Sequence, residues 1–204
     1  MNEDEAKFYL RNNLGFSDLD MERLEEFRES LLNFNKSYNL ISKSTENKIW
    51  SRHILDSAQL LRFFSTKSNI NIADLGSGAG FPGIIIAIIN KNEHFHVKLY
   101  EKSSVKRDFL YIIREKLDLK IDIIENVNDE IIIADIIVSR AFKKLEQIIR
   151  ISRETTKKPH KLIILKGKNA QEEINKVSLD KNYSYKLENS ITDIDSKIII
   201  IDVR

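Results

Sequence analysis

The sequence predicts an α/β fold with an open, mostly parallel sheet of about seven strands and helices on both faces. Three observations predict it. From residue 67 onward, short β-branched apolar runs alternate with helical segments, which is typical of parallel strands buried on both faces. The last two runs are joined by a loop alone, so that pair is expected to be antiparallel. A glycine-rich run also follows the first strand, where such sheets bind nucleotide-like ligands.

Residues 1–66 predict a helical cap, followed by a sheet domain over residues 67–204, with the two forming one compact unit. Asp20 is in position to cap a helix over residues 21–34, because apolar side chains recur there at spacings of three and four. A second cap helix is expected over residues 45–64.

The sheet domain divides into strands and helices by the length and periodicity of its apolar runs. The expected strands are residues 70–75, 97–100, 121–124, 134–138, 162–165, 183–187 and 197–203. The expected helices are residues 83–90, 105–116, 145–155 and 170–179.

The composition excludes several classes of protein. The chain of 204 residues has no cysteine, which rules out disulfides, thiolate zinc sites, iron–sulfur clusters and a cysteine nucleophile. The longest apolar run, residues 84–89, spans six residues, far short of the roughly 20 needed to cross a membrane. The acidic start is unlike a signal peptide. We therefore expect a cytoplasmic protein without a membrane partner.

The net charge of +2 hides an uneven distribution. Residues 1–40 carry nine acids and five bases, whereas residues 140–168 carry ten bases and two acids. Asymmetry of this kind indicates that a polyanion is held against one part of the molecule.

The glycine-rich run reads DLGSGAGFPG over residues 74–83 and holds four of the six glycines. Glycine permits positive φ and lets a ligand approach the backbone closely. Glu101 ends the next expected strand, 21 residues after Gly80, where a carboxylate accepts hydrogen bonds from two ribose hydroxyls. A tight turn without a ligand is disfavoured by this density of glycine.

Two cofactors fit this pattern, a dinucleotide and S-adenosylmethionine. Asp74 favours the second, because a carboxylate facing the loop suits a cationic sulfonium better than a pyrophosphate. No tyrosine is followed four residues later by lysine, so the pair typical of short-chain dehydrogenases is missing. Methyl transfer to a nitrogen lone pair needs positioning more than acid–base groups. An NAD-dependent oxidoreductase and a non-catalytic RNA-binding module stay open as alternatives.

Five motifs in order give the chain a family resemblance over roughly residues 35–170. They are NLI at 39–41, RHILDS at 52–57, DLGSGAGFPG at 74–83, SRA at 139–141 and LKG at 165–167. This series resembles the ribosomal RNA small-subunit methyltransferase G family, also called glucose-inhibited division protein B.

The resemblance implies a class I methyltransferase with a Rossmann-like sheet, which uses S-adenosylmethionine to methylate N7 of one guanine of 16S rRNA near the decoding site. It implies 16S rRNA or the small ribosomal subunit as partner, and we expect a monomer. The cofactor-binding residues it implies, together with those of the glycine loop, are Asp74, Gly76, Ser77, Gly78, Gly80, Phe81, Glu101, Asn128, Asp129 and Arg140. Asp129 stands where the family often has glutamate, and Glu101 where aspartate is commoner.

The resemblance and the basic segment together predict the RNA-binding residues. They are Arg52, His53, Arg140, Lys143, Lys144, Lys157, Lys158 and Lys166. Arg52 is also placed to pair with Asp56 at i,i+4. No residue is assigned as a catalytic acid or base, because guanine N7 has a free lone pair at neutral pH. No metal is expected, since His94 and His96 lack a third ligand.

Overall fold

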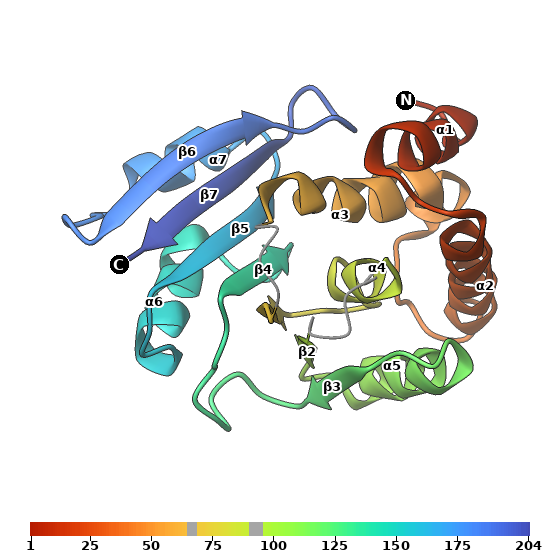
Figure 1. The fold of residues 1–204 in the computed structure, drawn as a ribbon, viewed down its shortest axis with the longest axis horizontal. Helices are drawn as coiled ribbons and strands as arrows, with labels where there is room; N and C mark the ends of the chain where they lie inside the picture. The colour runs from red at the N-terminus through yellow and green to blue at the C-terminus, as the bar shows by residue number, and fades with distance from the viewer. Residues whose placement is uncertain (65–68, 90–95) are drawn as a thin grey trace.

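The computed structural model describes residues 1–64, 69–89 and 96–204. Its centre is a seven-stranded sheet in the order β3-β2-β1-β4-β5-β7-β6 (Figure 1). The strands β1 to β5 are parallel, and β7 runs antiparallel between β5 and β6. The strands are β1 (Asn71–Leu75), β2 (His96–Tyr100), β3 (Ile121–Ile124), β4 (Ile136–Arg140), β5 (His160–Lys166), β6 (Tyr183–Asn189) and β7 (Lys197–Val203). The predicted fold class is confirmed.

Alternating side chains of the strands divide the core into two layers, one on each face of the sheet. Ile72 of β1 faces the layer formed with α4 (Gly83–Ile88), α5 (Ser104–Lys116) and the helical cap. Its neighbour Ala73 faces the layer formed with the other two helices. Those helices are α6 (Leu145–Thr155) and α7 (Ala170–Asn175). Both faces of the sheet are therefore covered, as doubly buried β-branched strands require.

Two sheet-domain helices differ from the prediction at their ends. The helix α7 ends at Asn175 rather than at residue 179, although Val177 and Leu179 still pack against the core. The helix α4 is assigned as far as Ile88, and residue 90, where we expected its end, lies outside the described residues.

The cap begins with two helices, α1 (Glu3–Leu14) and α2 (Asp18–Asn35). The helix α1 is not among the separate elements that the sequence predicts. Ser17, and not Asp20, caps α2: the Ser17 hydroxyl accepts from the Asp20 N–H, and the Asp20 carboxylate accepts from the Ser17 N–H. Asp20 is thus the distal member of a capping box, which satisfies two otherwise unpaired N–H groups at once.

The second cap helix is not continuous. It consists of a 3₁₀ turn (Lys43–Lys48), a π-helical segment (Trp50–Leu55), the short α3 (Asp56–Ala58) and a second 3₁₀ turn (Gln59–Phe63). Glu3 of α1 stabilises the start of the π-helical segment, because its carboxylate accepts hydrogen bonds from the backbone N–H groups of Trp50 and Ser51. Such wide turns often occur at functional sites.

The order of the strands reverses between β1 and β4, which pair with each other although β2 and β3 lie between them in sequence. In open α/β sheets, ligands bind outside the carboxyl ends of the strands at this switch point. The glycine loop after β1 and the segment after Arg140 of β4 both open there. The β6–β7 connection, residues 190–196, reaches the same edge, because Lys197 of β7 pairs with Lys166 of β5 (Figure 1).

Asp74 anchors the glycine loop from below. Its side chain is completely buried, and Oδ2 accepts a hydrogen bond of 2.9 Å from the Gly83 N–H at the start of α4. A Cβ at Gly83 would lie 2.7 Å from the same oxygen, so the contact requires glycine. Burial raises the pKa of Asp74 to about 7, although the Gly83 N–H and the Ser77 hydroxyl act in the opposite direction.

We expect Asp74→Asn to remove one component of the pH dependence of stability. Because the folded-state pKa is about 7 and the ordinary value is 3.8, native Asp74 keeps a proton between these pH values that the unfolded chain has lost. The contribution of Asp74 to the free energy of unfolding therefore falls as pH rises from about 4 to about 7. Urea unfolding across this range should give a more negative slope of unfolding free energy against pH for the unmodified protein than for the variant. Equal slopes would contradict the assignment.

Candidate functional site

Two adjoining cavities open at the switch point. The first has a volume of about 660 Å³ and lies over the glycine loop and the ends of β1 and β2. The second, of about 370 Å³, lies between the cap and the ends of β4 and β5. His53, Arg140 and Ala141 line both cavities, so these residues form the wall between them.

The glycine loop forms the floor of the first cavity. Gly76 and Gly78 have φ values of +75° and +58°, in the left-handed region. A Cβ on Gly76 would lie 2.2 Å from the Phe142 ring, which covers the loop. Among the described residues, only the Gly76 carbonyl lies within 4 Å of a Cβ on Gly78, at 3.9 Å, and Gly78 lines the cavity. Gly78 thus leaves open a space that any side chain would narrow.

Glu101, which follows β2, lines the same cavity. Its Oε2 accepts a hydrogen bond of 2.8 Å from the Gly78 N–H, and its Oε1 accepts one of 2.8 Å from the Ser103 N–H. An ionised carboxylate has about four lone-pair sites, so each oxygen still has capacity for a hydroxyl donor. The arrangement fixes the carboxylate against the glycine loop at the wall of the cavity.

The structure brings most of the predicted cofactor residues together around the first cavity. Asp74, Gly80 and Asp129 are not among its lining residues. Asp74 is buried under the loop, and a Cβ on Gly80 would lie 2.4 Å from Ile84, so both shape the loop from beneath. The Asp129 N–H donates to the Asn126 carbonyl in a turn. The predicted residues that line the cavity are Gly76, Ser77, Gly78, Phe81, Glu101, Asn128 and Arg140.

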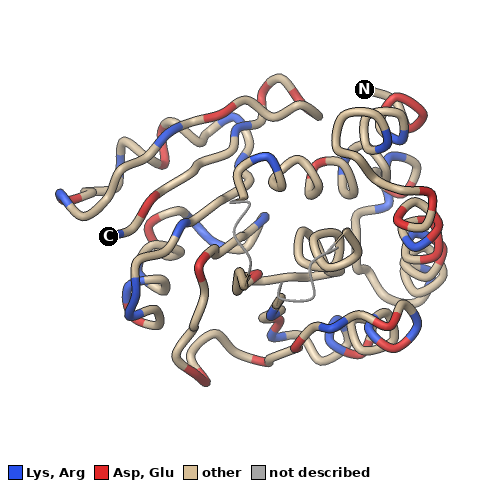
Figure 2. The backbone as a smooth tube through the Cα atoms, viewed as in Figure 1, with Lys and Arg blue, Asp and Glu red and all other residues tan. Residues whose placement is uncertain are grey.

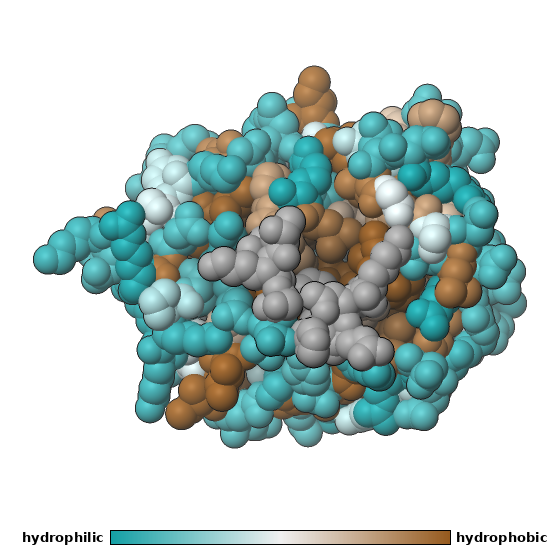
Figure 3. Space-filling model, in the orientation of Figure 1, coloured by the Kyte–Doolittle hydropathy of each residue, from teal (hydrophilic) through white to brown (hydrophobic). Residues whose placement is uncertain are grey.

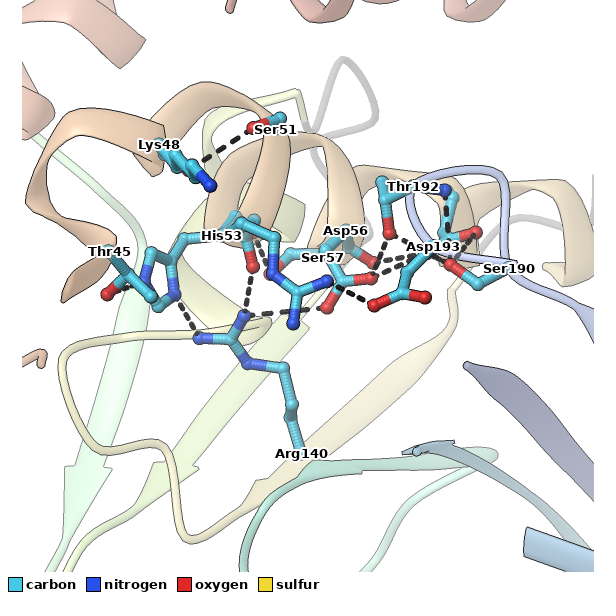
Figure 4. A network of polar contacts seen from close by, with 12 residues as sticks. Thr45, Lys48, Ser51, His53, Asp56, Ser57, Arg140, Ser190, Thr192 and Asp193 are labelled. Atoms are coloured by element: carbon cyan, nitrogen blue, oxygen red, sulfur yellow. Dashed lines mark hydrogen bonds and ion pairs between the residues drawn. The ribbon is translucent and has the colours of Figure 1, made fainter. Parts of the chain in front are cut away.

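Arg140, the last residue of β4, is held by the cap (Figure 4). Its guanidinium donates to the Arg52 carbonyl at 3.0 Å and to Nδ1 of His53 at 2.9 Å. Asp56 Oδ2 lies 3.5 Å from the same guanidinium, and the Phe81 ring lies 4.7 Å below it. The Arg140 side chain is only 17% exposed, so these contacts replace water.

His53 is neutral in this arrangement. Burial, followed by the charges of Arg140 and Arg52, lowers the pKa of His53 to about 3. Because a guanidinium only donates, Nδ1 of His53 must accept, and Nε2–H then donates to the Thr45 hydroxyl at 2.9 Å. The imidazole also stacks on Phe81 with ring centroids 5.0 Å apart. His53 therefore serves as a fixed acceptor for Arg140.

Asp56 and Arg52 have different partners from the pair that the sequence predicts. Arg52 forms an ion pair with Asp193 of the β6–β7 connection. Asp56 instead faces Arg140, and its Oδ1 accepts from the Thr192 hydroxyl at 2.7 Å and from Gln59 Nε2 at 2.9 Å. A long-range contact between the cap and the end of the chain has replaced a local one (Figure 4).

The bases of the 140–168 segment separate in the fold. Lys143 lines the first cavity and Lys166 the second, and Lys144 directly precedes α6. Lys158 pairs instead with Asp135, which accepts a hydrogen bond from the first residue of β1. This pair therefore lies at the amino ends of the parallel strands, away from both cavities. Lys157 is its chain neighbour. The predicted RNA-binding residues therefore do not form one surface.

Lys166 is held in place rather than extended into solvent. Its side chain is 12% exposed, and Nζ donates at 2.8 Å to both the Lys143 carbonyl and Glu173 Oε2. These bonds fix the segment after β4, where Ala141 has a φ of +51°. Positive φ at a residue other than glycine is uncommon and often marks a functional site.

Sequence reasoning missed several cavity residues. Lys102, Lys106 and Arg150 add positive charge to the first cavity. Lys102 and Lys106 lie beside or in a helix whose charges resemble an ordinary solvated face, whereas Arg150 belongs to the basic segment of residues 140–168 but has no predicted role of its own. Figure 2 shows acidic residues on α1 and α2. Figure 3 shows apolar side chains near the middle of the same face, over α4.

Within the ranges described, no group of three or more His, Cys, Asp or Glu residues is placed to hold a metal ion. His94 lies outside those ranges, and His96 Nε2 lies 2.9 Å from Asp122 Oδ2. No helix among the described residues has the length and apolar character needed to cross a membrane.

Solved structures with low sequence identity share this fold. The chain is similar to a chain of the fibrillarin/Nop5p complex, with a TM-score of 0.55, 14% identity and coverage of 74% of this chain and 80% of that one. M. jannaschii TYW2 in complex with AdoMet gives a TM-score of 0.55 at 16% identity, covering 76% of each chain. MtNAS in complex with MTA and tNA gives 0.60 at 11% identity, covering 100% of this chain and 82% of that one.

Sequence relatives are much closer. The family model described as rRNA small subunit methyltransferase G matches residues 20–198. A protein of that name from Orientia tsutsugamushi (strain Ikeda) is 38% identical over 197 residues, covering 96% of each chain. Its namesake from Rickettsia prowazekii is 36% identical over 183 residues, covering 89% of this chain and 93% of the relative. The chain therefore belongs to the rRNA small subunit methyltransferase G family, a family of S-adenosylmethionine-dependent methyltransferases.

Proposed function

We propose that the protein transfers the methyl group of S-adenosylmethionine to N7 of one guanine of 16S rRNA, near the decoding site. The observation that carries the proposal is the shared wall of the two cavities, where the Arg140 guanidinium is held between a donor cavity and an acceptor cavity. Membership of the methyltransferase family supports the reaction class and does not favour the NAD-dependent and non-catalytic alternatives.

The residues of the first cavity fit S-adenosylmethionine, which supplies an electrophilic methyl group when bound. Gly78 leaves the floor open to close approach, and Glu101 presents carboxylate oxygens for the two ribose hydroxyls. Asn128 lies with Asn126 and Val127 in the segment where the adenine is expected. A dinucleotide fits less well, because the carboxylates of Asp74 and Glu101 lie beneath and beside the loop where a pyrophosphate would need positive charge.

The residues of the second cavity suit a guanine that enters from the RNA. Guanine N7 carries a free lone pair at neutral pH, so no side chain has to remove a proton from it. Arg140 has N–H donors at the shared wall for guanine O6, the acceptor next to N7. Catalysis then consists of alignment, because holding two reactants in line supplies several kcal/mol without acid–base chemistry.

The RNA is expected to lie over the carboxyl ends of the parallel strands, where the two cavities open. Arg52 and Lys166 line the second cavity, and Lys102, Lys106 and Lys143 line the first. These bases suit phosphates, which dominate affinity without reading sequence. Lys157 and Lys158 lie at the amino ends of the parallel strands, where they contact only RNA that wraps around the sheet. Their role in RNA binding stays a prediction.

Several partner assignments follow from the same proposal. The substrate is 16S rRNA, free or within the small ribosomal subunit, which places the enzyme in the cytoplasm. Action as a monomer stays a prediction.

The direct test is methylation of 16S rRNA taken from cells that lack the gene. We expect the purified protein and S-adenosylmethionine to restore one 7-methylguanine, detected as a single aniline-induced break. Free rRNA and small subunits are tested in parallel, which identifies the form that the enzyme accepts. If neither form gains a break, the proposed substrate is wrong.

Gly78→Ala should weaken cofactor binding by roughly tenfold or more, because the methyl group occupies the floor of the first cavity, and tenfold corresponds to about 1.4 kcal/mol. Gly15→Ala is the matched control: Gly15 ends α1 at a φ of +70°, no atom of the described residues lies within 4 Å of its Cβ position, and Gly15 lines neither cavity. Both variants should lose about 1 kcal/mol of stability through backbone strain. Calorimetry with S-adenosylmethionine distinguishes them, and equal affinities for the two variants would contradict the placement of the cofactor over Gly78.

A further inference from the structure

The second cavity contains one acidic group among its described lining residues, the carboxylate of Asp56. Asp56 belongs to the RHILDS motif, but local spacing makes it merely a partner for Arg52. In the structure it faces Arg140 instead, with Oδ2 3.5 Å from the guanidinium. Asp56 is therefore a hydrogen-bond acceptor in a cavity that is otherwise rich in basic side chains, and it suits a ligand that carries N–H donors.

The position of Asp56 is fixed from two sides. Its Oδ1 accepts from Thr192 of the β6–β7 connection at 2.7 Å and from Gln59 of the cap at 2.9 Å. Gln59 is itself tied to that connection, since its Oε1 accepts from the Ile191 N–H at 2.9 Å. Among the contacts of the described residues, Oδ2 has only the Arg140 guanidinium as a partner. The second oxygen is therefore both held in place and free to accept further hydrogen bonds.

A guanidinium followed by a carboxylate is complementary to one edge of guanine. From N7, the groups around the base are the acceptor O6, the donor N1–H and the donor N2–H₂. Adenine presents a donor at position 6 and an acceptor at N1, which is the reverse order. Arg140 therefore matches O6, and Asp56 Oδ2 matches N1–H and N2–H₂, whereas adenine would place like groups together at both positions.

We propose that Asp56 is the specificity-determining residue of the acceptor cavity, where it accepts hydrogen bonds from N1–H and N2–H₂ of the guanine whose O6 is bound by Arg140. The inference rests on the proposed function, because it assumes that a guanine enters the second cavity. Asp56 does not touch the methyl donor. It selects the base, and it keeps N7 pointed toward the first cavity by holding the opposite edge.

The test removes one hydrogen-bonding group from the base and one from the protein. Two 16S rRNAs are made by ligation, identical except for guanosine or inosine at the target position. Inosine keeps O6, N1–H and N7 but lacks the 2-amino group. The unmodified protein should methylate the inosine RNA about 10- to 100-fold more slowly in kcat/KM, the size expected when a hydrogen bond to a charged group is lost. Asp56→Asn should lower the guanosine rate and bring the guanosine-to-inosine ratio close to one.

A structural role for Asp56 predicts a different outcome. If the carboxylate only holds Arg140, Asp56→Asn lowers both rates by the same factor and leaves the ratio unchanged, which would overturn the proposal. Asp193→Asn is the matched control: it removes the ion pair of Asp193 with Arg52, and Asp193 does not line the cavity, so the ratio should stay that of the unmodified protein. Absence of methylation on both RNAs by the unmodified protein would refute the proposed function itself, a result distinct from failure of this inference.

Discussion

Arg140 ends a buried strand, and β4 itself offers no group to compensate its charge. Removing a guanidinium from water is costly unless acceptors replace the water. The acceptors here come from the cap, as the Arg52 carbonyl, the neutral imidazole of His53 and the carboxylate of Asp56. The site therefore depends on one interaction between a strand end and a helical segment that lies 84 to 88 residues earlier in the chain.

This dependence explains the shape of the cap. The π-helical segment places Arg52 and His53 at the sheet edge, and Glu3 of α1 stabilises that segment from outside. Phe27 of α2 packs edge-on against Phe81, with ring centroids 5.4 Å apart, and Phe81 in turn supports both His53 and Arg140. The β6–β7 connection is joined to the cap through Thr192 and Asp193, which contact Asp56 and Arg52. The cap is thus part of the candidate site.

Sequence reasoning was sufficient where the signal is local. Alternating apolar runs predicted the strands, and the clustered glycines predicted the loop after β1, because backbone geometry there depends on neighbouring residues. It failed where partners are distant in sequence. The pairs Asp56–Arg140 and Arg52–Asp193 span 84 and 141 residues, so no spacing rule indicates them. The helix over 45–64 was predicted as continuous, because nothing local shows that Glu3 supports an irregular turn. The basic segment likewise predicts one surface, although Lys158 lies before the amino end of β5 and Lys166 lies at its carboxyl end.

The most direct test of this account is the protonation state of His53, because the wall between the cavities requires a neutral imidazole that accepts from Arg140. Nitrogen-15 NMR of the imidazole across a pH titration reports both the pKa and the tautomer. We expect a pKa of about 3 for His53 and a single Nε2–H tautomer throughout the neutral range. A folded-state pKa below the ordinary value also means that the contribution of His53 to stability falls as pH drops below about 6.5, where the unfolded chain binds the proton first. A pKa near 6.5 with mixed tautomers would show a solvated imidazole, and the proposed wall would not exist.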